Sequence, residues 1–157
     1  MNKKNEWETE PDKKEFTYKG FRCVILRHPE LKHLCGYVAL PEGNALDGIP
    51  YDDININVHG GLTFAKSKTE KHPRFPGYGT VIGFDCAHYT DYNPGVTNEK
   101  LKKLTTYRNM AFVEKQCKSM VDQIINGVKI TKHDEPKRLA SKSINEKELI
   151  VKCRKRQ

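Results

Sequence analysis

The sequence predicts an α+β fold, in which an antiparallel sheet is covered on one face by one long C-terminal helix. Short stretches between residues 16 and 84 are rich in β-branched and aromatic residues and are separated by turn residues, as in antiparallel strands. A later stretch has the apolar spacing of an amphipathic helix. The chain has 157 residues, which is enough for one domain with a hydrophobic core.

The first two strands are predicted to form a hairpin. Residues 16–18 and 21–26 are mostly apolar or aromatic and flank Lys19-Gly20, a two-residue turn that contains glycine. Residues 34–40 form a further predicted strand. Residues 80–84 are nearly apolar on both faces, so we expect that strand to lie in the centre of the sheet.

Residues 54–59 alternate strictly between apolar and polar side chains, which predicts a strand with one buried face. The polar face carries Asn55, Asn57 and His59. Asparagine is uncommon in strands. This face is therefore predicted either to contact a ligand or to hydrogen-bond a neighbouring loop.

The helix is predicted over residues 99–126, where most apolar side chains fall on one stripe. Residues 97–99 offer candidate N-caps, and Gly127 is a candidate C-terminal stop. We expect this helix to cover the apolar face of the sheet.

The chain divides into a charged lead-in of residues 1–15, a single domain of residues 16–128 and a basic tail of residues 129–157. There are 28 Lys and Arg against 20 Asp and Glu, a formal net charge of +8, and the tail carries +6 of it. The domain is therefore close to neutral, which argues against a nucleic-acid-binding domain. The tail would attract nucleic acid only non-specifically.

Cysteine usage and the N-terminal sequence indicate the compartment. The first fifteen residues contain no apolar segment typical of a signal peptide, and no apolar run is long enough to span a membrane. The cysteines are dispersed without a CxxC pair: Cys23, Cys35, Cys86, Cys117 and Cys153. We therefore expect a cytoplasmic protein with reduced thiols and no membrane partner.

His59-Gly60-Gly61 ends the alternating strand, and three interpretations stay open. The glycines could form a bulge that bends the strand. They could instead offer backbone N–H groups to an anion or carbonyl. In the third interpretation, His59 is a catalytic histidine beside an oxyanion site.

A second group of polar residues follows the central strand: Asp85, Cys86, His88 and Asp91. With His59 they could form a metal cluster, although the spacing matches no closed zinc pattern. Cys86 and His88 could form a nucleophile pair. In the structural alternative, Cys86 is a small buried residue and an aspartate caps the turn. These patterns are not specific enough to assign a catalytic residue, a metal ligand or a cofactor.

Residues 66–79 form a basic loop that contains proline, glycine and aromatic residues. Long loops of this kind are often binding loops or lids. Aromatic side chains beside Arg74 would suit a base or nucleotide, by stacking and phosphate neutralisation.

Several motifs in combination resemble a known family: Cys35-Gly36-Tyr37-Val38, Tyr51-Asp52-Asp53, Val58-His59-Gly60-Gly61-Leu62-Thr63-Phe64, Gly83-Phe84-Asp85-Cys86-Ala87-His88 and Tyr107-Arg108. The family consists of small uncharacterised proteins of bacteriophages and prophages of Gram-positive bacteria. The resemblance covers residues 16–126 and leaves out the basic tail. It implies an accessory phage protein that acts against host defence, either as a sponge for a nucleotide immune signal or by cleaving one.

From the residues and the resemblance together, we predict a phage-encoded counter-defence protein that sequesters a nucleotide-derived host immune signal in the host cytoplasm. The predicted ligand-binding residues are Asn55, Asn57, His59, Gly60, Gly61, Arg74, Asp85, His88, Asp91 and Arg108. The first five would hold polar groups, Asp85 or Asp91 a ribose hydroxyl, and Arg74 or Arg108 a phosphate. We expect a homo-oligomer, because subunits can enclose a ligand between them.

Two alternatives remain. One is a metal- or histidine-dependent phosphodiesterase that uses His59, Asp85, His88 and Asp91 to degrade such a signal. The other is a direct protein inhibitor of a host defence protein. The sequence favours a binding protein over an enzyme.

Overall fold

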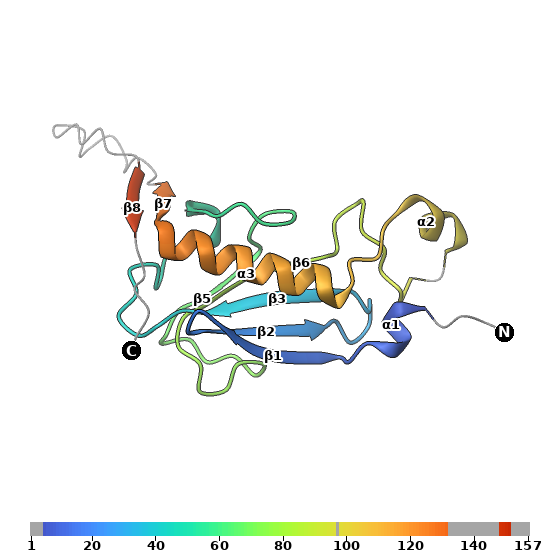
Figure 1. Cartoon of the computed structure of the whole chain (residues 1–157), viewed down its shortest axis with the longest axis horizontal. Coiled ribbons are helices and arrows are strands. Elements are labelled where there is room, and N and C mark those ends of the chain that lie inside the picture. Colours follow the sequence, from blue (N-terminus) through green and yellow to red (C-terminus); the bar gives the residue numbers. More distant parts are fainter. Residues whose placement is uncertain (1–4, 97, 132–147, 152–157) are drawn as a thin grey trace.

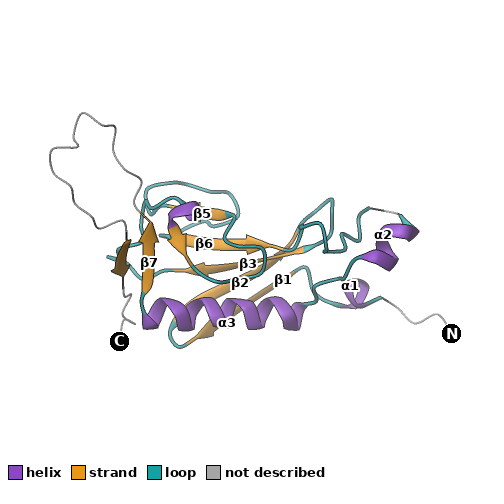
Figure 2. Cartoon of the chain, turned by 90° about the horizontal axis from the view of Figure 1, so that it is seen from above, coloured by secondary structure: helices purple, strands orange, loops and turns teal. Residues whose placement is uncertain are grey.

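The computed structural model describes residues 5–96, 98–131 and 148–151. Its centre is a five-stranded antiparallel sheet in the order β1-β2-β3-β6-β5 (Figure 1). The strands are β1 (Lys13–Tyr18), β2 (Phe21–Arg27), β3 (Leu34–Ala39), β5 (Phe64–Lys66) and β6 (Val81–Asp85). The helix α3 (Met110–Asn126) runs along one face of this sheet (Figure 2). The predicted α+β class is confirmed, although two strands follow the helix.

The hairpin of β1 and β2 forms as predicted. Tyr18 pairs with Phe21, and the turn residues Lys19 and Gly20 both have positive φ, 48° and 85°. Two successive positive φ values are the signature of a type I′ turn, whose twist matches that of the flanking strands. The strand β6 lies between β3 and β5, so its predicted central position is also confirmed.

Ordered structure begins earlier than the predicted boundary at residue 16. The short helix α1 (Glu6–Thr9) precedes β1. The Trp7 ring contacts the rings of Tyr92 and Tyr107, with centroids 5.2 and 5.1 Å apart. The lead-in is therefore anchored by the aromatic packing of Trp7, the one residue of this segment that the sequence offered as an anchor.

The prediction of one helix over residues 99–126 is wrong, because the chain forms α2 (Glu99–Leu104) and then α3. Between them, Thr106 pairs with the loop after β6: its N–H donates to Thr90, and its carbonyl accepts from Tyr92. Helix α3 starts afresh at Asn109, whose side chain accepts from the Phe112 N–H as an N-cap. Gly127 ends α3 as predicted, at φ 110°.

The main core lies between α3 and the sheet. The buried helix stripe consists of Met110, Val113, Cys117, Met120, Val121 and Ile124. It packs on the face that carries Cys23, Ile25, Val38, Ile82 and Phe84. A Cβ on Gly36 would lie 2.8 Å from the Cys117 sulfur and 2.5 Å from the Phe84 ring. Glycine at this position therefore sets how closely the helix approaches the sheet.

A second, three-stranded sheet is formed by β4 (Ile54–Asn55), β7 (Val128–Thr131) and β8 (Glu148–Val151). The predicted strand over 54–59 is thus shorter than expected, because β7 pairs only with its first two residues. Its predicted faces are correct: Ile54, Ile56 and Val58 are buried, and the two asparagines are exposed. The predicted tail from residue 129 begins inside β7; residues 132–147 and 152–157 lie outside the described residues.

The opposite face of the main sheet is covered by the loop of residues 67–80. Phe75 is buried there against Tyr37 and Phe64, at ring distances of 4.8 and 5.5 Å. The Lys66 ammonium donates to the carbonyls of Ser67, Tyr78 and Gly79 at 2.7–3.0 Å. The loop predicted as a binding loop or lid is therefore tied down as a cover of the sheet.

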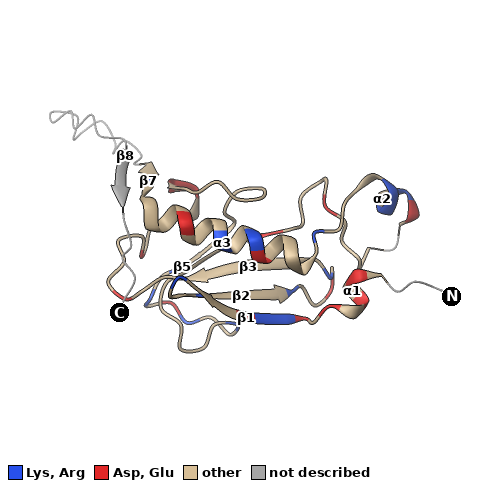
Figure 3. Ribbon diagram, viewed as in Figure 1, with Lys and Arg blue, Asp and Glu red and all other residues tan. Residues whose placement is uncertain are grey.

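Basic and acidic residues are interspersed along the described part of the chain (Figure 3). None of the helices in this part is both long enough and apolar enough to cross a bilayer.

Candidate functional site

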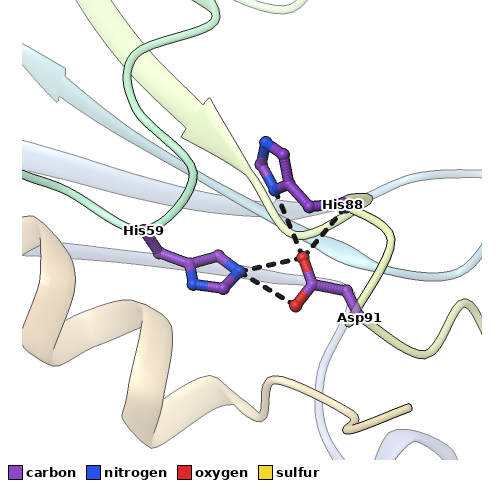
Figure 4. Close-up of side chains that lie close together, drawn as sticks. All are labelled: His59, His88 and Asp91. Atoms are coloured by element: carbon purple, nitrogen blue, oxygen red, sulfur yellow. Dashed lines mark hydrogen bonds and ion pairs between the residues drawn. The ribbon is translucent and has the colours of Figure 1, made fainter. Parts of the chain in front are cut away.

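A buried carboxylate, that of Asp91, is the centre of a polar cluster (Figure 4). Nε2 of His59 lies 2.9 Å from each of its two oxygens. Nε of Arg108 donates to Oδ1 at 2.8 Å. The backbone N–H of His88 donates to Oδ2 at 3.0 Å, and the Nδ1 of the same residue lies 3.3 Å from that oxygen. One carboxylate thus holds two imidazoles and a guanidinium.

Three separate segments bring these side chains together. His59 lies in a turn after β4, and its backbone N–H donates to the side chain of Gln116 on α3 at 3.0 Å. His88 and Asp91 share a turn after β6, closed by a 2.8 Å hydrogen bond from the Asp91 N–H to the His88 carbonyl. Arg108 lies just before α3. The site depends on the docking of helix and sheet.

Gly60 is required by this arrangement for two reasons. Its φ is +68°, a conformation that side chains with a Cβ rarely adopt. A Cβ at this position would also lie 2.0 Å from the His88 ring. The glycine therefore makes room for the imidazole, which the interpretation of a simple bulge did not foresee.

The charge state of Asp91 follows from its partners. Burial alone would raise the pKa of its carboxyl group, but hydrogen bonds from Arg108, His59 and the His88 N–H outweigh burial and hold the pKa below its usual value. The carboxylate is therefore ionised at neutral pH, and it fixes the positions of the groups around it.

A nucleophile pair of Cys86 and His88 does not fit the structure. The Cys86 side chain is 1% exposed, and burial raises the pKa of its thiol. A buried, protonated thiol is a poor nucleophile. Cys86 has the structural role that was the alternative interpretation.

The cluster contains five of the ten predicted ligand-binding residues: His59, Gly60, His88, Asp91 and Arg108. Asp85 and Gly61 lie beside it. The Asp85 carboxylate is 3.9 Å from Nδ1 of His88 and accepts the Ala87 N–H. Gly61 has φ +80°, and a Cβ added to it would meet no atom within 4 Å, so its need for glycine is conformational.

The other three predicted residues lie elsewhere. The Asn55 amide donates to the Thr131 hydroxyl in the second sheet. Asn57 exchanges two backbone hydrogen bonds with the side chain of Gln123. Arg74 donates to the Tyr37 hydroxyl from the loop that covers the opposite face of the main sheet. Of the two arginines proposed for a phosphate, only Arg108 is in the cluster.

Sequence reasoning missed two residues of α3 that support the site, Gln116 and Phe112. The Phe112 ring contacts the His59 ring edge-on at 5.2 Å. It also missed His33, a 4% exposed histidine stacked on His28 at 5.0 Å. Burial, and then the neighbouring His28, lower the pKa of His33. Nothing in the local sequence distinguishes these residues from ordinary core or loop positions.

A cavity of about 230 Å³ lies away from the cluster, between the segment 46–51 and strands β5 and β6. Its walls include Leu46, Ile49, Tyr51 and Ile82. None of the ten predicted residues lines it.

Three residues of the cluster could hold a metal ion. One donor atom each from His59, His88 and Asp91 lie within 4.8 Å of one another. Both histidine side chains are partly exposed, at 16% and 31%, so a ligand or ion can reach them.

Neither a protein-family model nor a curated protein nor a solved structure matches the chain. The resemblance to bacteriophage proteins therefore stays a prediction, and the function is inferred from the geometry of the cluster.

Proposed function

We propose that the protein binds a phosphate-bearing, nucleotide-derived small molecule at the cluster around Asp91 and sequesters it. The context that fits this activity is counter-defence by a bacteriophage in the cytoplasm of the host cell, where the ligand is an immune signal. The observation that supports the proposal most is the way in which Arg108 is held.

Arg108 uses only Nε to bind Asp91, at 2.8 Å. Its guanidinium stands over the Phe112 ring, 5.3 Å from the centroid. Within the described ranges, nothing hydrogen-bonds to its two terminal nitrogens. A guanidinium fixed in this way offers a planar pair of N–H donors, which matches the oxygens of a phosphate.

Asp91 holds the side chains of the site in place before binding, but it also adds one negative charge to the site. Because its oxygens fix Arg108 and both imidazoles before any ligand arrives, less side-chain entropy is lost on binding. His88 contacts Asp91 through its Nδ1 side, which leaves Nε2 as a second polar atom of the cluster. The ligand would then bind across His88 and Arg108.

A homo-oligomer is part of this proposal. The side chains of His59, His88 and Arg108 are 16%, 31% and 23% exposed, and the cavity described above is not beside them. A second copy of the chain could enclose a ligand that one copy leaves half open. Light scattering with and without ligand measures this directly.

Hydrolysis of such a molecule is the second candidate function, and the three possible metal ligands His59, His88 and Asp91 favour it. Two histidines and one carboxylate are the ligands of many catalytic zinc sites. A phosphodiesterase would return a product, whereas a sequestering protein would release its ligand intact.

The test is calorimetric binding of cyclic dinucleotides and adenine-dinucleotide derivatives, followed by heat denaturation and mass spectrometry of the released molecule. Arg108→Lys keeps the charge but removes the planar fork, so affinity should fall at least tenfold, about 1.4 kcal/mol. Arg74→Lys is the matched control on the opposite face and should bind as wild type. Equal affinity of the two variants would contradict the proposal.

A further inference from the structure

We propose that His59, His88 and Asp91 form a binding site for a divalent transition-metal ion such as zinc. Oδ2 of Asp91 lies 2.9 Å from Nε2 of His59 and 3.3 Å from Nδ1 of His88. Ligands about 2.0–2.2 Å from a tetrahedral zinc ion are about 3.2–3.6 Å apart. The two spacings to Asp91 are therefore close to those of a zinc site, and all three donor atoms lie within 4.8 Å of one another.

The chemistry of the donors selects the kind of ion. Two imidazole nitrogens and one carboxylate oxygen suit zinc and its neighbours in the first transition row. Magnesium and calcium prefer sites made of oxygen ligands alone. The site is thus expected to discriminate strongly against these two ions.

The surrounding residues already hold the donors in place. Arg108 binds Oδ1 of Asp91, so Oδ2 is directed at the two imidazoles. Gln116 fixes the backbone of His59 at 3.0 Å, and the absent side chain of Gly60 leaves space for the His88 ring. Such outer contacts orient ligands and raise metal affinity.

Three protein ligands leave one tetrahedral position for a further ligand. His88 is the more exposed histidine, at 31%, and Arg108 is 23% exposed, so a further ligand can reach the site from solvent. A bound ion would also offset the charge of Asp91, which otherwise repels a phosphate. The inference that the ion helps to bind phosphate rests on the proposed function, but the ion site itself does not.

The first experiment uses the full chain, stripped of metal by a chelator, with zinc chloride alone as the probe and no nucleotide. Calorimetry should show one saturable zinc site per chain. His88→Ala and Asp91→Asn should each weaken zinc binding about 100-fold or more. His72→Ala, which removes a histidine outside the cluster, is the matched control and should bind as wild type. Excess magnesium should not compete.

Because a variant can fail to fold, the second experiment uses wild-type protein only. The chain has 6 histidines. Nitrogen-edited NMR of their imidazoles should show large zinc-induced shifts for two of them, and cobalt should give the visible absorption of a tetrahedral site. Shifts at other histidines, no saturable binding, or an aqueous cobalt spectrum would overturn the proposal.

Arg108→Lys separates this inference from the proposed function. The variant keeps all three metal donors, so a saturable zinc site should persist, weakened by no more than about 10- to 100-fold through loss of the outer contact to Asp91, while nucleotide binding falls. Zinc binding without any nucleotide binding in wild type would support the ion site and reject the proposed function. If metal-free protein binds nucleotide and no zinc site is found, the proposed function is supported and the ion site is rejected.

Discussion

Two buried charges in this protein are satisfied in different ways. Lys66 is 2% exposed, and its ammonium donates only to backbone carbonyls of the loop that it ties down. Asp91 is 4% exposed, and most of its partners are side chains that reach the surface and carry further polar atoms. A charge bound by backbone groups stabilises the fold, whereas one that organises titratable side chains prepares a site.

The largest effect on stability should come from Lys66→Met. The change leaves three carbonyls near the sheet without their donor and frees the loop of residues 67–80, so we expect a loss of about 3–5 kcal/mol of unfolding free energy. Zinc and nucleotide affinity per folded molecule should not change. Chemical denaturation and calorimetry measure both. A stable Lys66→Met protein would show that the loop does not depend on this charge.

Asp91→Asn should lower the unfolding free energy less than Lys66→Met does, but it should remove the binding site around Asp91. The amide keeps the volume of the carboxylate, and Arg108 and the histidines are partly exposed and can turn to solvent, so we expect a loss of about 2 kcal/mol. Zinc binding should be lost, because the anionic ligand is gone. Thermal melting with and without zinc tests this: the melting temperature of wild type should rise with zinc and that of the variant should not.

Acid unfolding should also distinguish wild type from Asp91→Asn. The pKa of Asp91 is lowered from 3.8 in the folded state, so its contribution is present above about pH 4 and is lost as the pH falls through the folded pKa. The stability gap between the two proteins should therefore shrink at low pH. His33, whose folded pKa is also lowered, causes a separate loss below about pH 6.5 that both proteins share. A gap that is constant from pH 7 to 2 would contradict this account.

His88→Ala should have the smallest effect on stability, about 1 kcal/mol or less, because the side chain is 31% exposed. Nucleotide affinity should still fall at least tenfold, about 1.4 kcal/mol. Equilibrium denaturation beside calorimetry gives both quantities. A large loss of stability with unchanged affinity would make His88 a structural residue like Lys66.

The parts of the fold that depend on local chemistry could be predicted from the sequence. The Lys19-Gly20 turn, the central strand and the stop at Gly127 are examples, because each is determined by neighbouring residues. The break between α2 and α3 could not be predicted, since it depends on pairing of Thr106 with a loop that is distant in sequence.

The candidate site shows the same limit. Asn55 and Asn57 were placed on the correct exposed face, but the pattern gave no information on what that face meets. From the sequence, Arg74 and Arg108 were equally good candidates for binding a phosphate. Only the path of the loop 67–80 takes Arg74 to the other side of the sheet. Local motifs found the histidines and Asp91, and tertiary structure selected the arginine.

The three segments that meet at Asp91 also determine when the site exists during folding. Residues 59, 88–91 and 108 are joined by long stretches of chain, and contacts of this kind form only after the intervening loops have closed. A partly folded chain therefore has no site, and any molecule that binds there stabilises the fully native state alone. At a free concentration one hundred times the Kd, that stabilisation amounts to about 2.7 kcal/mol. Protein with a molecule bound at this site should consequently resist unfolding and proteolysis better than empty protein.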